Sequence, residues 1–223
     1  MKKEEIIATE TISDNEIIAR VIRGEKELFA ILVRRYNQRL YRVAMSIIND
    51  DIETEDVMQS AYIKAYENLG KFEFRSAFGT WLTRILINES LLQLRKRKQS
   101  LAMNDDMIKN KIDQGAVTDP STPLSETLNG ELKEILEEAI RRLPEKYRTV
   151  FILREIENMN VAETQECLDL SETNVKVRLN RSKALLRDSL SRYYKKEDLF
   201  HFHLSRCSRV TDYVMKQIEL MSV

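Results

Sequence analysis

The sequence predicts an all-α protein in which a flexible acidic linker joins two small helical domains, the second containing a helix-turn-helix. Three observations lead to this prediction. The 223 residues include only 5 glycines and 3 prolines, so the chain is poor in residues that form turns. Apolar side chains recur at steps of three and four, which is typical of amphipathic helices. One central stretch has few large apolar residues and is rich in aspartate, so it separates two helical blocks.

Charge and composition argue against several classes of function. Lys+Arg and Asp+Glu each number 36, so any nucleic-acid binding must come from local charge. The five glycines are too scattered to form a phosphate-binding loop. The only histidines are His201 and His203, so most of the chain lacks the commonest general base. We therefore expect no enzymatic activity and no cofactor.

The expected location is the cytoplasm. Cys167 and Cys207 provide no disulfide framework, and the chain opens without an apolar signal segment. No stretch of about 18 consecutive apolar residues occurs, so no membrane span is expected.

The first domain is expected over 13–99, after a disordered N-terminus at 1–12. Ser13 and Glu16 have the spacing of a capping box, which predicts a short helix ending near Gly24. Two apolar stripes with helical spacing follow. They consist of Phe29, Leu32, Tyr36, Leu40, Val43 and Ile47, and of Val57, Ala61, Ala65 and Leu69.

The first domain is expected to end with a long helix from Thr80 to about Gln99. The acidic linker is expected at 100–125 and the second domain at 126–198. A C-terminal extension helix is expected at 199–223.

The second domain has the pattern of a helix-turn-helix. A short helix at 161–168, a turn at 169–171 and a longer helix from 172 to about 190 are expected, with Ser171 as the N-cap of the longer helix. Its inward face holds Val175, Leu179, Ser182, Leu186 and Leu190. Its outward face holds Thr173, Asn174, Val177, Asn180 and Arg181, flanked by Lys176 and Arg178. Such a face can read the major groove, although a solvated charged face is the alternative.

The segment from Lys71 to Lys98 combines aromatic and basic residues. Aromatic rings beside cations suit single-stranded nucleic acid, because unstacked bases lie on the rings while the backbone follows the charge. A helix core with a basic C-terminal end is the alternative.

The C-terminal part of the chain contains three potential zinc ligands, His201, His203 and Cys207. Their signal for a zinc site is weak, since their spacing matches no standard zinc finger.

Five segments together resemble a known family: Phe29–Tyr36, Glu55–Gln59, Phe78–Ile85, Leu143–Arg148 and Val175–Arg181. In order and spacing they resemble the extracytoplasmic-function (ECF) group of sigma-70 type sigma factors, the promoter-recognition subunits of bacterial RNA polymerase. The chain departs from the family at Ala162–Cys167, and Asp169 replaces the usual turn glycine. Aspartate tolerates the left-handed conformation better than most residues.

The resemblance implies three sets of site residues. Core-polymerase binding is implied for Glu55, Asp56, Gln59 and Arg35. Contact with the minus-ten element is implied for Lys71, Phe72, Arg75, Phe78, Trp81, Arg84, Asn88, Arg95 and Arg97. Contact with the minus-thirty-five element is implied for Ser171, Thr173, Asn174, Lys176, Arg178, Asn180 and Arg181.

The resemblance also implies the partners. They are core RNA polymerase, bound through its β′ clamp and β flap, promoter DNA and an anti-sigma factor, with no metal and no small-molecule substrate. The implied role is transcription initiation in a stress or envelope response, with the protein on the nucleoid when in holoenzyme. The alternative is a stand-alone helix-turn-helix regulator whose first block dimerises or binds an effector.

Overall fold

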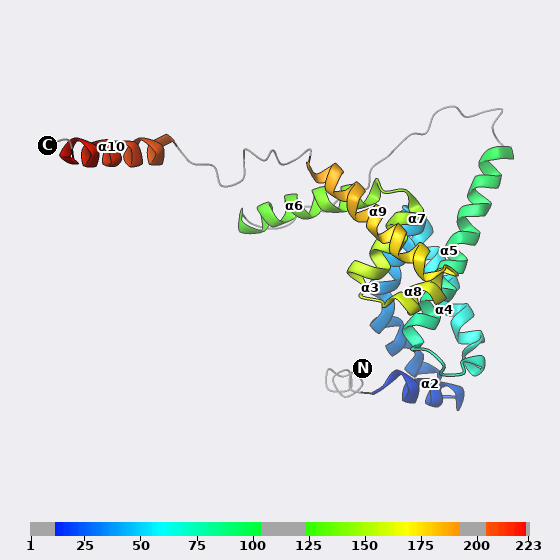
Figure 1. The fold of residues 1–223 in the computed structure, drawn as a ribbon. Coiled ribbons are helices and arrows are strands. Elements are labelled where there is room, and N and C mark those ends of the chain that lie inside the picture. Colours follow the sequence, from blue (N-terminus) through cyan, green and yellow to red (C-terminus); the bar gives the residue numbers. More distant parts are fainter. Residues whose placement is uncertain (1–11, 104–123, 192–203, 222–223) are drawn as a thin grey trace. The chain divides into compact units, whose positions relative to one another are not determined.

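The computed structural model describes residues 12–103, 124–191 and 204–221, which form helices and turns and contain no strand. The chain divides into two compact units, residues 1–186 and 187–223. In chain order the α-helices are α2 (Asp14–Ile22), α3 (Phe29–Ile48), α4 (Asp51–Glu67), α5 (Phe78–Met103), α6 (Leu124–Arg141), α7 (Glu145–Phe151), α8 (Val161–Leu168), α9 (Glu172–Ser191) and α10 (Leu204–Met221) (Figure 1). The prediction of an all-α protein is confirmed.

Local capping sets the ends of the first helices. The Ser13 hydroxyl accepts from the Glu16 amide at 3.3 Å, as the capping-box spacing predicts. The Asp50 carboxylate accepts from the Glu53 amide at 3.0 Å and starts α4. After α3 ends at Ile48, Asn49 caps the helix with a left-handed φ of 57°, a conformation that asparagine adopts more readily than most residues.

Helices α3, α4 and α5 pack around one apolar core. Both stripes expected from the sequence point into it, and the buried residues include Leu32, Leu40, Val43, Ile47, Val57, Ala61, Leu82 and Leu86. Gly79 lets the start of α5 approach α3 closely, because a Cβ at this position would lie 2.6 Å from Cε1 of Tyr36. The core holds the outer face of α4 and the start of α5 in fixed positions.

The second block forms the expected helix-turn-helix. α8 and α9 have the predicted bounds, and Asp169 between them has φ 52° and ψ 51°, the left-handed conformation. Asn160 and Glu163 form a capping box that starts α8. The Ser171 hydroxyl accepts from the Asn174 amide at 3.3 Å, so the predicted N-cap of α9 is confirmed.

The two helical blocks also pack against each other, which the sequence did not predict. The Arg148 Nε donates to the Ser46 carbonyl at 2.6 Å and so satisfies an acceptor in the last turn of α3. The Cys167 thiol donates to the Thr80 carbonyl at 3.4 Å. Leu153 and other residues of the second block share the core of the first.

Some predicted boundaries shift, and others lie outside the described residues. α5 continues to Met103, past the expected end near Gln99, and α6 begins at Leu124. The rest of the expected linker, at 104–123, and the N-terminal residues 1–11 are not described. α10 forms a helix within the expected extension. In the part of the chain that the structure describes, no helix has the combination of length and hydrophobicity that a transmembrane span requires.

Candidate functional site

A polar strip lies on the outer face of α4. Glu55, Asp56 and Gln59 are all exposed, whereas Val57 and Ala61 point into the core. The structure thus brings the three predicted residues together on one accessible surface, with two carboxylates free to meet a cation.

Two isoleucines extend this strip, and the sequence reasoning missed them. Ile52 is 78% exposed and Ile63 is 60% exposed. With Asp56 and Gln59 they follow the steps of four, three and four that place residues on one helix face. That spacing could have revealed them, but the sequence alone does not show that this face is the outward one. A surface with apolar ends and an acidic centre suits a protein partner.

Arg35 does not join this strip. It lies on α3, where its guanidinium forms an ion pair with Asp14 and donates to the Ile12 carbonyl at 3.0 Å. These bonds attach the start of α2 to α3. The structure therefore gives Arg35 a role within the chain, and its contact with polymerase stays a prediction.

The structure corrects the expected orientation of two aromatic residues. Phe72 and Phe78 were expected to face DNA, but both rings are buried. Phe78 packs against Tyr36 at 5.7 Å and against Phe72 at 5.8 Å, measured between ring centroids. Neither ring offers a free face to a base, because the aromatic cluster seals the junction of α3 and α5.

Truncating Phe78 is expected to destabilise the fold. The side chain is 2% exposed and contacts three aromatic rings. Phe78→Ala should lower the free energy of unfolding by about 3 to 5 kcal/mol through lost burial and a residual cavity. Urea unfolding followed by circular dichroism measures this loss. A loss below about 1 kcal/mol would contradict the core assignment.

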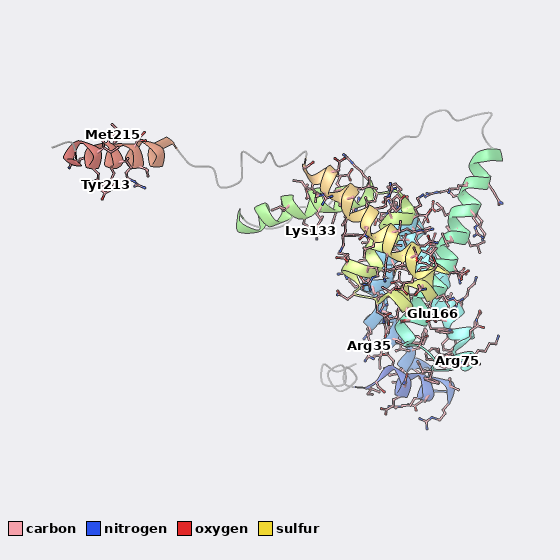
Figure 2. The ribbon with its side chains drawn as sticks, viewed as in Figure 1. Arg35, Arg75, Lys133, Glu166, Tyr213 and Met215 are labelled. Carbon is pink, nitrogen blue, oxygen red and sulfur yellow. The ribbon has the colours of Figure 1, made fainter. Side chains whose placement is uncertain are left out.

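The exposed aromatic ring of this segment belongs to Phe74. Its side chain is 48% exposed and its ring lies 4.8 Å from that of Phe72. Its φ of 57° is unusual for a bulky residue. Arg75 follows it, strongly exposed and 2.8 Å from the Glu73 carboxylate (Figure 2). The loop therefore presents one ring and one cation side by side.

The other residues expected at the minus-ten element have different environments. Lys71, Arg84, Asn88 and Arg95 are exposed, whereas Trp81 is partly buried against the core. Arg97 instead donates to the Ile48 carbonyl at 3.4 Å and lies 3.6 Å from the Glu53 carboxylate. These bonds link the far part of α5 to α3 and α4.

The outward face of α9 is open to solvent. Ser171, Thr173, Asn174, Lys176, Asn180 and Arg181 are exposed, and Arg178 is partly exposed. Val175, Ser182 and Leu186 are buried on the opposite side, as the spacing predicts. Lys176 lies 2.5 Å from Glu172, but both side chains are solvated, so this ion pair is weak enough to exchange for a phosphate.

The described residues contain no group of three or more His, Cys, Asp or Glu side chains placed to hold a metal ion. His201, His203 and the side chain of Cys207 lie outside them. Cys167 is buried, and burial raises the pKa of its thiol to about 12. Its thiol therefore stays protonated near neutral pH and acts as a packing group and hydrogen-bond donor.

Comparison with known proteins assigns the family. Residues 32–100 match the family sigma-70 region 2, and residues 133–186 match the family sigma-70, region 4. The chain is 30% identical over 176 residues to the ECF RNA polymerase sigma factor SigW of Bacillus subtilis, covering 78% of this chain and 94% of that protein. The chain belongs to the ECF group of sigma factors. The expectation drawn from the five segments is confirmed.

Other relatives of this ECF sigma factor agree. The ECF RNA polymerase sigma-E factor of Haemophilus influenzae is 29% identical over 187 residues, which cover 81% of this chain and 97% of that protein. The sigma factor RpoE of Bartonella quintana, solved with the anti-sigma factor NepR, has a TM-score of 0.59 at 21% identity, covering 73% of this chain and 96% of that one. This structural similarity supports the fold.

Membership of the family gives the function in outline. A sigma factor binds core RNA polymerase and directs it to promoters, and sigma factors are initiation factors rather than enzymes. The first helical block of this sigma factor contains region 2 and the second contains region 4.

Proposed function

We propose that the α4 strip is the surface through which this sigma factor binds core polymerase. The observation that carries the proposal is the run of Ile52, Asp56, Gln59 and Ile63 on one exposed helix face. Exposed isoleucines are costly in water and are covered when a partner docks. The carboxylates between them suit a basic partner and set its register.

We also propose two DNA surfaces. The exposed residues of the loop and of α5, namely Lys71, Phe74, Arg75, Arg84, Asn88 and Arg95, contact the minus-ten region, and the outward face of α9 contacts the upstream element. Each surface has few cations, and the chain as a whole has formal net charge +0, so each binds DNA weakly. Core polymerase would hold the two surfaces at a fixed spacing. Once one surface is bound, the other then binds at a high effective concentration, so the two weak affinities combine.

Alanine substitutions of the cationic residues of α9 should distinguish side chains that read bases from side chains that contact phosphates. Replacing a base-reading arginine at 178 or 181 should cost roughly 1 to 3 kcal/mol and relax sequence preference. Losing the phosphate contact proposed for Lys176 should weaken all sequences alike and lower the salt slope by about one. Holoenzyme binding to promoter variants at several salt concentrations measures both effects.

The matched control for these variants is Lys216→Ala, which removes an exposed cation from α10. Normal initiation by all three α9 variants, at a promoter that depends on its upstream element, would favour the solvated-face interpretation.

Reconstitution tests the whole proposal. The purified chain should allow core polymerase to initiate at a defined set of promoters, which sequencing of transcripts after overexpression identifies. Tight operator binding without polymerase would instead favour the stand-alone regulator. A defined catalytic activity or bound zinc in the purified protein would contradict the expectation from the sequence that the chain has neither.

We further propose regulation by an anti-sigma factor. One similar solved structure is the sigma factor RpoE in complex with the anti-sigma factor NepR, and another is CnrH in complex with the cytosolic domain of CnrY. Action in the cytoplasm, on the nucleoid when in holoenzyme, follows from the proposed role. Co-purification from cells of the source organism tests for such a partner.

A further inference from the structure

Val177 occupies the centre of the outward face of α9. Its side chain is 51% exposed, although valine has no polar group to interact with water. At 100° per residue, Thr173, Val177, Asn180 and Ala184 lie within an arc of about 60°. The residue is therefore surrounded along the helix by the side chains proposed to read DNA.

Packing in the core does not explain why an apolar residue occupies position 177. Val175, Ser182 and Leu186 already bury the inward face of α9, and Val177 lies about 200° from Val175 around the helix. A β-branched side chain also slightly disfavours the helix. A single exposed apolar residue is common on a surface, so exposure alone has little meaning. Its position within the reading face is what requires an explanation.

The major groove offers one apolar group at the base edges, the C5-methyl of thymine. The other groups there are hydrogen-bond donors and acceptors, which lose hydration without compensation when a valine covers them. We propose that Val177 reads a thymine of the upstream promoter element through this methyl group. The proposal rests on the proposed function of α9 and adds the kind of base that the face selects.

Removing the methyl group from DNA tests this contact. Holoenzyme made with the full chain is bound to a promoter identified by transcript sequencing, with each upstream thymine replaced in turn by deoxyuracil. Holoenzyme with the wild-type chain should bind about fourfold more weakly when deoxyuracil replaces the contacted thymine. Burial of one methyl group contributes about this factor to affinity. Val177→Ala should lose a similar factor on the thymine promoter and no longer distinguish thymine from uracil there.

Two further variants sharpen the test. Val177→Thr keeps one methyl group and should keep part of the discrimination. Val210→Ala removes the same atoms from a valine of α10 that is 52% exposed, and should keep the wild-type preference. Discrimination that survives in Val177→Ala, or wild-type affinity that no upstream methyl group affects, overturns the proposal.

Other outcomes identify what failed. If Val177→Ala weakens binding to core polymerase without DNA, the side chain contacts protein and the thymine assignment is wrong. If Arg181→Ala alters promoter selection while the Val177 variants do not, α9 reads DNA and only this inference fails. If the wild-type chain gives no promoter-specific initiation, the proposed function itself fails.

Discussion

Asp56→Lys is expected to abolish stable binding to core polymerase while the fold stays intact. The side chain is exposed on α4, so the change creates no cavity and leaves no buried charge. At an interface, however, it replaces an attractive charge by a repulsive one at the centre of the strip. Losing a central charged contact costs roughly 2 to 5 kcal/mol, or about 30-fold to several thousandfold in Kd.

Affinity for purified core enzyme, measured by fluorescence anisotropy of the labelled full chain, checks this expectation. Circular dichroism should show unchanged helix content. The matched control is Glu27→Lys, which makes the same change in charge at an exposed position before α3. Equal affinities for Asp56→Lys and wild type would remove the α4 strip from the polymerase interface.

The flanking isoleucines give this expectation a second test. Ile52→Ala and Ile63→Ala remove apolar contact and leave charge unchanged, so their effect should persist at high salt. The effect of Asp56→Lys should shrink as salt screens the charge. This difference separates docking of a complementary protein surface from general charge attraction.

Local chemistry explains why much of the second block could be predicted from the sequence. The ends of α8 and α9 depend on the cap at Ser171 and on the left-handed turn at Asp169, and both involve residues within a few positions of one another. Helical spacing also identified Val175 and Leu186 as core residues. Such features need no knowledge of the rest of the fold.

Contacts between distant residues explain what could not be predicted. Arg148 bonds to the Ser46 carbonyl, 102 positions away, and no local pattern signals that bond. The rings of Phe72 and Phe78 look suitable for stacking in the sequence, because an aromatic residue beside a cation has the same signature whether it is buried or exposed. Only the packing of α5 against α3 shows that these two rings lie inside.

The burial of Phe78 changes which residues should assist promoter melting. Melting exposes bases that need a ring face, and the loop before α5 offers Phe74 for this purpose, with Arg75 beside it. The left-handed backbone at Phe74 supports this assignment, since unusual conformations of bulky residues persist where the surroundings hold them and often mark functional loops.

A variant with both Phe74→Ala and Arg75→Ala is therefore expected to transcribe poorly from a fully paired promoter. Stacking contributes roughly 1 to 3 kcal/mol per base, so the loss should be about 5-fold to 150-fold. On a template with a pre-melted bubble the defect should shrink, because the step that these side chains assist has already occurred. Run-off transcription with reconstituted holoenzyme on both templates measures the difference.

Two controls make the melting result decisive. Tyr213→Ala with Arg209→Ala removes an exposed ring and an exposed cation from α10 and should not reproduce the template-dependent defect. The loop variant should also keep wild-type affinity for core enzyme and wild-type helix content, since Arg75 is strongly exposed and Phe74 lies in a loop outside the helices. If those properties hold and the defect is equal on paired and pre-melted templates, the loop has no part in opening DNA. Recovery confined to the bubble template would instead place Phe74 and Arg75 on the path of the separated strand.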